Sequence, residues 1–147
     1  MPSSPTRPGG DLVRASAVTR ALNVLGEVWT VLLIKEAFEG ARRFQAFQER
    51  LGIPRQTLMR RLSDLTEQQI FYKKPVQHRT LVYEYRLTAK GLDLYPFVLS
   101  VWCWHRRWNP RQSFLPARLM HRPCGHVLAP RFICRACQAD IGLEDVV

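Results

Sequence analysis

Three leucines in the stretch RLGIPRQTLMRRLSDL, residues 50–65, constrain the fold more strongly than any other feature of the chain. Leu58, Leu62 and Leu65 follow the i, i+4, i+7 spacing that places side chains on one face of an α-helix. Pro54 fits the first turn of that helix, where its missing backbone N–H costs nothing. The spacing predicts a helix from Pro54 to about Gln69, with the leucines facing a core. The other face carries side chains suited to phosphates and base edges: Arg55, Gln56, Arg60 and Ser63.

The positive charge of the chain is concentrated around this helix and again near the end. The net charge is +10, from 22 Lys and Arg against 12 Asp and Glu. Residues 42–79 contain nine basic and three acidic residues, and residues 105–147 contain seven basic and three acidic ones. Such an excess argues for a polyanionic partner, either nucleic acid or an anionic membrane surface. A solvated surface is the commoner role of a single arginine, but two separate basic zones favour nucleic acid.

Length and composition fit one soluble domain with a small appendage. The chain has 147 residues, of which 46% are hydrophobic, enough for an ordinary core. No apolar run approaches the roughly 20 residues that span a bilayer. The opening MPSSPTRPGG lacks the apolar centre of a signal peptide, so residues 1–11 are expected to be a flexible N-terminus. We therefore expect a cytoplasmic protein with no membrane partner, in which the four cysteines are thiols or metal ligands.

The segments before the leucine helix predict three further helices. Residues 12–25 show helical apolar spacing, and residues 27–38 are apolar enough to be a buried helix. Residues 42–52 form a short amphipathic stretch that ends at Gly52, a good helix C-cap. Two short helices joined by a turn that contains glycine are typical of a helix-turn-helix motif. In that motif the first helix crosses the nucleic-acid backbone and the second enters the major groove.

The segment after the leucine helix predicts a β-hairpin. Residues 70–76 and 81–87 alternate in polarity, with a tip around Pro75–Thr80. A plain hairpin that covers the core would explain the alternation but not the basic tip. In a helix-turn-helix protein, the helix that enters the major groove is called here the reading helix. A basic hairpin directly after the reading helix indicates a wing. The basic residues expected at its tip are Lys73, Lys74, His78 and Arg79.

Residues 88–108 predict a last helix that is rich in tryptophan. Thr88 is a candidate N-cap, and Pro96 bends the helix unless the helix begins nearby. Three tryptophans within seven residues are more apolar surface than a small domain usually hides. A dimer interface shared with the N-terminal helix is therefore favoured. The alternative is that the tryptophans cover the core of their own chain. The residues expected in the interface are Leu12, Leu22, Trp102, Trp104 and Trp108.

Several of these stretches resemble one known family. ALNVLGEVWTVLLIKEAFEGARRFQAFQERLGI, followed by LMRRLSDL and YEYRLTAKG, is similar to the HxlR-type transcriptional regulators over residues 16–108. These are bacterial, MarR-related winged helix-turn-helix proteins. The resemblance implies a mainly α fold with a small β-hairpin wing (α+β), and a homodimer that binds a pseudo-palindromic operator. It also implies that the two copies dimerise through their first and last helices. Two positions depart from the family: Ser16 stands where many members have a sensing cysteine, and Thr80–Leu81 replaces a Pro-containing turn in the wing.

The residues expected to contact DNA follow from the reading helix and its neighbours. Gln56 can pair bidentately with adenine, and Arg55 or Arg60 with guanine. Arg61 lies nearer the leucine side and is expected to touch phosphate or an acidic neighbour. The full set is Arg43, Arg55, Gln56, Thr57, Arg60, Arg61, Lys73, Lys74, His78 and Arg79.

The tail HRPCGHVLAPRFICRAC, residues 121–137, has the donor spacing of a metal site. Cys134-x-x-Cys137 and His121-x-x-Cys124 would together give a closed, tetrahedral, structural Zn²⁺ site, with His126 as the rival fourth ligand. A small hairpin turning at Ala129–Pro130 is expected between them. Reduced buried thiols and a disulfide are the alternatives. Cys103, between two tryptophans, is expected to be a small buried hydrophobic residue.

Together these features predict two regions: a winged helix-turn-helix DNA-binding and dimerisation domain at 12–110, and a zinc-ribbon-like Cys/His tail at 111–147. The favoured function is a sequence-specific transcriptional regulator that binds double-stranded DNA as a homodimer. A small-molecule effector is a further candidate partner. The alternative is a protein-interaction module of the transcription machinery. No Ser/His/Asp set, paired carboxylates or phosphate loop is visible in the sequence, so no enzyme is expected.

Overall fold

The computed structural model describes residues 16–76, 82–109 and 119–146. The chain divides into two compact units, one up to Tyr95 and one from Pro96 onward, and each is described by itself. The flexible start expected at 1–11, together with Leu12, His78 and Arg79, lies outside the described residues. The boundary expected at 110–111 does so too, and the helix before it groups with the tail.

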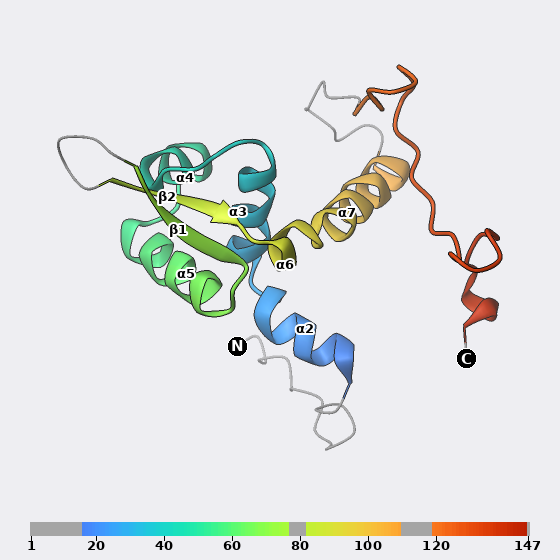
Figure 1. The fold of residues 1–147 in the computed structure, drawn as a ribbon, viewed down its shortest axis with the longest axis horizontal. Coiled ribbons are helices and arrows are strands. Elements are labelled where there is room, and N and C mark those ends of the chain that lie inside the picture. The colour runs from blue at the N-terminus through green and yellow to red at the C-terminus, as the bar shows by residue number, and fades with distance from the viewer. Residues whose placement is uncertain (1–15, 77–81, 110–118, 147) are drawn as a thin grey trace, which may run out of the picture. The chain divides into compact units, whose positions relative to one another are not determined.

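The first unit contains the helices and the hairpin that the sequence predicts (Figure 1). Its elements are, in order, α2 (Ala17–Leu25), α3 (Val28–Phe38), α4 (Phe44–Leu51), α5 (Arg55–Glu67), β1 (Phe71–Val76), β2 (Val82–Leu87) and α6 (Ala89–Leu92). This is a mainly α fold with a two-stranded antiparallel hairpin, which confirms the expected winged helix-turn-helix class. The helix-turn-helix motif is α4 and α5.

The leucine face of α5 forms the centre of the core, as its spacing predicts. Leu58 and Leu62 are fully buried, and Leu65 is 2% exposed. They are buried together with apolar side chains of α3, α4 and β1: Leu33, Ile34, Ala37, Phe47 and Phe71. Burying a leucine-sized side chain contributes about 1.5–3 kcal/mol, so this face fixes α5 on the domain and leaves its other face in solvent.

The turn that joins α4 to α5 is set by a glycine and a proline. Gly52, the C-cap of α4, has a φ of 61°, a left-handed conformation that favours glycine. Pro54 precedes α5 instead of lying in its first turn, because its ψ of 136° is extended. Its carbonyl accepts the first helical hydrogen bond, from the Leu58 N–H at 2.9 Å. The end of α5 at Glu67 comes two residues earlier than predicted.

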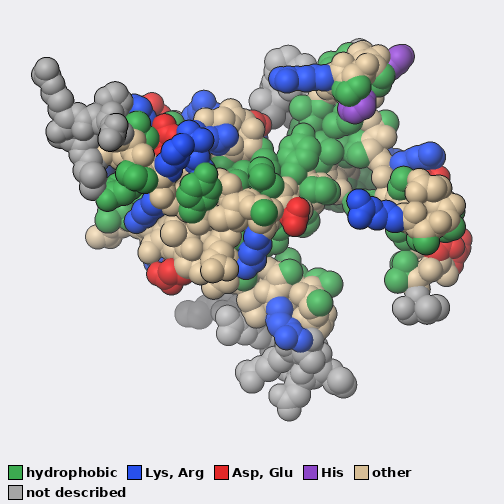
Figure 2. Space-filling model, viewed as in Figure 1, with side chains coloured by type: hydrophobic (Ala, Val, Ile, Leu, Met, Phe, Trp, Pro, Cys, Tyr) green, Lys and Arg blue, Asp and Glu red, His purple; other side chains and the backbone are tan. Residues whose placement is uncertain are grey.

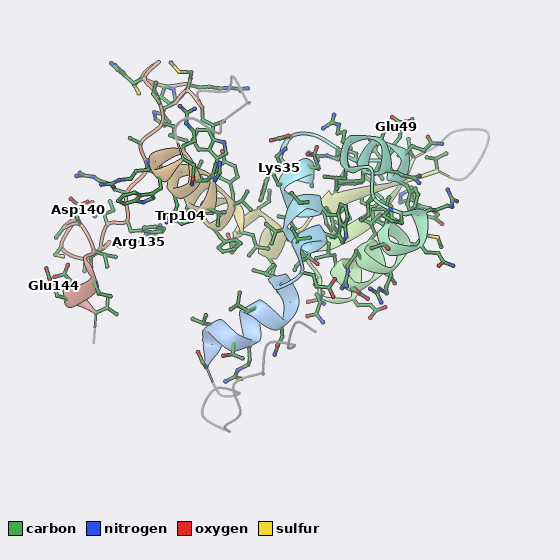
Figure 3. All side chains as sticks on the ribbon, turned by 180° about the vertical axis from the view of Figure 1, so that it is seen from behind. Lys35, Glu49, Trp104, Arg135, Asp140 and Glu144 are labelled. Carbon is green, nitrogen blue, oxygen red and sulfur yellow. The ribbon has the colours of Figure 1, made fainter. Side chains whose placement is uncertain are left out.

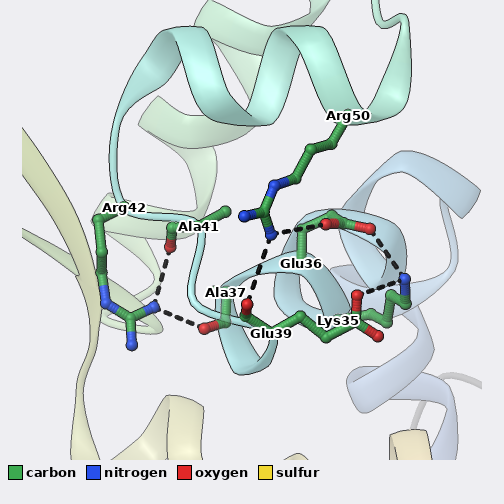
Figure 4. A network of polar contacts seen from close by, with 7 residues as sticks. All are labelled: Lys35, Glu36, Ala37, Glu39, Ala41, Arg42 and Arg50. Carbon is green, nitrogen blue, oxygen red and sulfur yellow. Dashed lines mark hydrogen bonds and ion pairs between the residues drawn. The ribbon is translucent and has the colours of Figure 1, made fainter.

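A network of charged side chains joins α3 to α4 (Figure 4). Glu36 is 7% exposed and accepts hydrogen bonds from Lys35 at 2.9 Å and from Arg50 at 3.4 Å. Arg42 donates to the carbonyl oxygens of Ala37 and Ala41. Because a buried carboxylate needs such partners, Glu36 fixes the position of α4 relative to α3.

The hairpin pairs β1 with β2 from Phe71 opposite Leu87 to Val76 opposite Val82. The backbone N–H of Tyr85 donates to the Arg42 carbonyl at 2.7 Å, which attaches β2 to the loop before α4. Lys73 and Lys74 lie within β1, so their expected position at the tip of the wing is wrong. The strand continues through them because both side chains stay in solvent while the backbone pairs with β2.

The predicted last helix is two helices. Thr88 is the N-cap of α6, and its hydroxyl accepts a hydrogen bond from the Gly91 N–H at 3.1 Å, as expected. α6 ends at Leu92, and α7 (Tyr95–Trp108) begins one residue before Pro96. Proline is tolerated in a first helical turn but not inside a helix. The helix is therefore interrupted before Pro96 and does not continue through it with a bend.

The second unit contains α7 and the tail, which ends in a short 3₁₀ turn, η1 (Leu143–Asp145). In the described tail the expected hairpin at Ala129–Pro130 is not formed, and a turn lies on either side of that position instead. Isolated β-bridges join Met120 to Val127 and Ile133 to Asp140. Among the described residues no single helix is long and apolar enough to cross a bilayer, and only α2 and α3 together, bent by 78°, match that length and composition.

Candidate nucleic-acid interface

The outward face of α5 presents the polar residues that the sequence places there. Arg55, Gln56 and Arg60 are exposed, opposite the buried leucines, while Thr57 is half-buried. Met59, which was not among the residues predicted to contact DNA, is 55% exposed on the same face. Its helical position, three residues after Gln56, is the signal that identifies it. The face therefore combines hydrogen-bonding groups with one apolar side chain, which is the mixture that base edges in a major groove require.

Aromatic packing orients the first arginine of this face. The Arg55 guanidinium lies 5.2 Å from the centroid of the Phe44 ring, at the first residue of α4. Such a cation–π contact is worth about 0.5–1 kcal/mol at an exposed site. Arg43, the N-cap of α4, is exposed beside it in the sequence. The start of α4 and the start of α5 thus carry exposed guanidinium groups.

The Arg61 side chain forms ion pairs within the protein. Of the two partners expected for it, a phosphate or an acidic neighbour, the structure shows the acidic neighbour. Its guanidinium forms ion pairs with Glu27, just before α3, and with Asp64 at 3.3 Å. The side chain is only 12% exposed. The Glu27 pair joins residues 34 positions apart and was not visible in the sequence, because nothing in a helical pattern indicates which distant residue faces Arg61.

The wing contributes cations from β1. Lys73 lies over the Tyr85 ring, 5.8 Å from its centroid, and Lys74 stands opposite Glu84 in the hairpin. Glu84 accepts hydrogen bonds from Arg86, which hold the pKa of its carboxyl below the ordinary value. The positive charges of Arg43 and Lys74 also lower the pKa of that carboxyl. The hydrogen bond from the Tyr85 N–H to the Arg42 carbonyl holds the loop before α4 beside the wing.

Two helices expose apolar side chains of the kind expected in a dimer interface. On α2, which has no buried residue, Val18 is 68% exposed and Leu22 53%. On α7, Trp104 and Trp108 are 62% and 66% exposed, whereas Trp102 is half-buried beneath the Arg106 guanidinium. Apolar side chains gather over α7 in Figure 2, and Trp104 is labelled on that helix in Figure 3.

The tail holds the expected zinc ligands as two pairs. His121 Nδ1 lies 3.2 Å from the Cys124 sulfur. Backbone N–H groups of Cys137 and Ala136, with the Cys137 side chain, hold the pKa of Cys134 below its ordinary value. Among residues 16–76, 82–109 and 119–146, no three His, Cys, Asp or Glu side chains are gathered around one metal position. Cys103 is half-buried on α7, where burial raises the pKa of its thiol.

Comparison with known proteins identifies the family of this fold. Residues 24–113 match the HxlR-like helix-turn-helix family. An uncharacterized HTH-type transcriptional regulator of Mycobacterium tuberculosis is 40% identical over 130 residues, which cover 88% of this chain and 82% of the relative. The crystal structure of PA1607, a candidate transcription factor, is 32% identical with a TM-score of 0.79, covering 94% of this chain and 97% of that one.

A second solved structure agrees with the first. PA1374 from Pseudomonas aeruginosa, another candidate transcription factor, is 30% identical with a TM-score of 0.62, and the match covers 87% of each chain. A family of transcriptional regulators confirms the expectation that the chain is not an enzyme. The reading helix, the wing and these relatives lead to one assignment: the chain belongs to the HxlR-like family of helix-turn-helix transcriptional regulators.

Proposed function

We propose that the chain regulates transcription by binding a pseudo-palindromic DNA operator as a homodimer, with α5 in the major groove of each half-site. The observation that carries this proposal is the two-faced character of α5. Three leucines anchor it, while Arg55, Gln56 and Arg60 are exposed together on the opposite face. Side chains in the first two turns of the second helix are those that reach base edges in helix-turn-helix docking.

A homodimer is supported by the exposed apolar residues on α2 and α7. Exposed tryptophans are costly in water, and aromatic residues are enriched where proteins associate. Two copies related by a two-fold axis present two α5 helices, which matches the symmetry of a palindromic operator. The cations of Arg43, Lys73 and Lys74 are suited to the phosphates beside each half-site.

Binding of selected operator DNA at increasing salt tests this function directly. Because each neutralised phosphate releases condensed counterions, the affinity of a DNA-binding regulator falls steeply as salt rises. We expect log Kd to change linearly with log salt, with a slope that reports several phosphate contacts per half-site. A flat salt dependence would instead favour the protein-interaction alternative.

Gln56→Ala is expected to weaken operator binding by about 1–3 kcal/mol, the cost of one bidentate pair with a base. The discrimination at a single base position should relax, because the side chain that distinguishes the bases is gone. Affinities for the operator and for each substituted operator measure both effects. Gln68→Ala is the matched control, since Gln68 is exposed at the far end of α5. Equal losses for both variants would contradict a reading role for Gln56.

Lys74→Ala is expected to weaken binding to all sequences alike and to lower the salt slope by about one, because a phosphate contact carries no sequence information. Titrations of operator and random duplexes at several salt concentrations measure this. Lys90→Ala removes another exposed lysine, one that donates to the Gln68 carbonyl at 2.7 Å, and should leave the slope unchanged. An operator-specific loss in Lys74→Ala would place that lysine at a base edge instead.

A further inference from the structure

The tail folds the same backbone turn twice, thirteen residues apart. In the first turn the His121 N–H donates to the His126 carbonyl at 2.9 Å and the Gly125 N–H donates to the His121 carbonyl at 2.8 Å. In the second, the Cys134 N–H donates to the Ala139 carbonyl and the Gln138 N–H to the Cys134 carbonyl, each at 2.8 Å. The hydrogen bonds of the two turns therefore correspond position by position.

The backbone angles and the flanking bridges repeat as well. Gly125 follows Cys124 in the first turn, and Gln138 follows Cys137 in the second. Their φ values, 68° and 60°, are both left-handed. Met120 bridges Val127 around the first turn, and Ile133 bridges Asp140 around the second. Left-handed backbone is costly for a side chain such as that of Gln138, so the second turn keeps this shape without the glycine that would ease it.

Each turn places two metal donors at its equivalent positions. His121 and Cys124 occupy the first and fourth positions of one turn, and Cys134 and Cys137 occupy those of the other. Within the first turn the donor atoms already lie 3.2 Å apart. Three thiolates and one imidazole on x₂ spacings are the ligand set of a closed tetrahedral zinc site.

We propose that the two turns of one chain close on a single Zn²⁺, held by His121, Cys124, Cys134 and Cys137. The corresponding turn positions also settle which histidine takes part. His126 corresponds to Ala139, a position at which the backbone carbonyl, not the side chain, closes the turn. The proposed ion is structural, because four protein donors leave no position open for a substrate.

Closure within one chain is favoured by the short connection between the turns. Nine residues, Gly125–Ile133, separate Cys124 from Cys134. A short connection gives the second pair an effective concentration of about millimolar with respect to the first, so the second pair of bonds forms without a partner molecule. The ordering of the pairs around the ion then occurs with metal binding, as is usual for small metal modules.

Cobalt titration of the full-length, reduced protein tests this site, because Co²⁺ in a tetrahedral thiolate site gives intense visible and charge-transfer bands. We expect saturation at about one Co²⁺ per chain, and displacement of these bands by Zn²⁺. Cys124→Ser and Cys134→Ser should each abolish the tetrahedral spectrum. Cys103→Ser and His126→Ala, which remove donors outside the proposed set, should preserve it. Loss in only one of the two turn variants, or loss in His126→Ala, would overturn the four-ligand assignment.

Two further measurements separate the site from folding and from assembly. Hydrogen exchange of zinc-free protein should be fast in 119–146 and unchanged in α3 to β2. A variant in which exchange is fast in the first unit as well has unfolded, and its missing cobalt spectrum says nothing about the metal ligands. A mixture of the Cys124→Ser and Cys134→Ser proteins should not regain the cobalt spectrum. Recovery in the mixture would show that the two turns come from different copies and would overturn the single-chain site.

Discussion

Replacing Leu62 with alanine is expected to lower the free energy of unfolding by about 2–5 kcal/mol, as large-to-small substitutions in cores do. Leu62 is fully buried between the other two leucines of α5, and in a close-packed core the removal of its side chain leaves a cavity. Because small domains are stable by only about 5–15 kcal/mol, the loss is a large part of the total. Denaturant unfolding followed by far-UV circular dichroism measures it.

Met59→Ala provides the matched control on the same helix. Met59 is 55% exposed, so its removal should change stability by no more than about 0.5 kcal/mol. The two variants should also differ in DNA binding by the folded protein. Met59 lies on the proposed DNA face, so its removal should weaken binding, whereas Leu62 does not lie on that face. Similar stability losses in both would mean that α5 is not anchored by its leucine face.

Placing glutamate at both Trp104 and Trp108 is expected to convert the proposed homodimer into a monomer at micromolar concentration. Two carboxylates in an apolar interface would be desolvated without partners, a cost of several kcal/mol each. Whole-operator affinity should fall by about 10²–10⁴-fold, because two linked reading helices bind with avidity that a single one lacks. Sedimentation velocity measures the assembly, and titration of operator DNA measures the binding.

A half-site duplex distinguishes this loss from damage to the reading helix. The double variant should bind one half-site as well as one subunit of the wild type does, since α5 is unchanged. Leu143→Glu, at a residue that is 98% exposed in η1, controls for an added carboxylate and should leave the dimer intact. A double variant that still sediments as a dimer would exclude α7 from the interface.

The sequence was most informative where one physical requirement decides the structure. The leucine spacing of α5 predicted both its helical state and its buried face, because only one face of a helix can meet the core. The left-handed Gly52 and the Thr88 cap were likewise predictable, since each satisfies a local backbone need. These short-range features fix the helix-turn-helix and the position of its exposed arginines.

The features that the sequence left open depend on distant partners or on competing local preferences. Nothing local indicates that Glu36 is buried with Arg50, or that Arg61 meets Glu27. Alternating polarity could not locate the wing tip, because Lys73 and Lys74 remain solvated inside the strand. The repeated turn of the tail was visible only as donor spacing, since its hydrogen bonds join backbone atoms that carry no sequence pattern.

The break between α6 and α7 consists of Asp93 and Leu94, and the boundary between the two units follows it, between Tyr95 and Pro96. In the proposed dimer, α7 contributes to the interface and α5 binds the DNA, and the chain that connects these two helices crosses Asp93 and Leu94. Substitutions there would change the number of base pairs that separate the two half-sites without changing the bases preferred within either one. Operator spacing and operator sequence would then be determined by different residues, and could diverge independently among relatives that share the same reading helix.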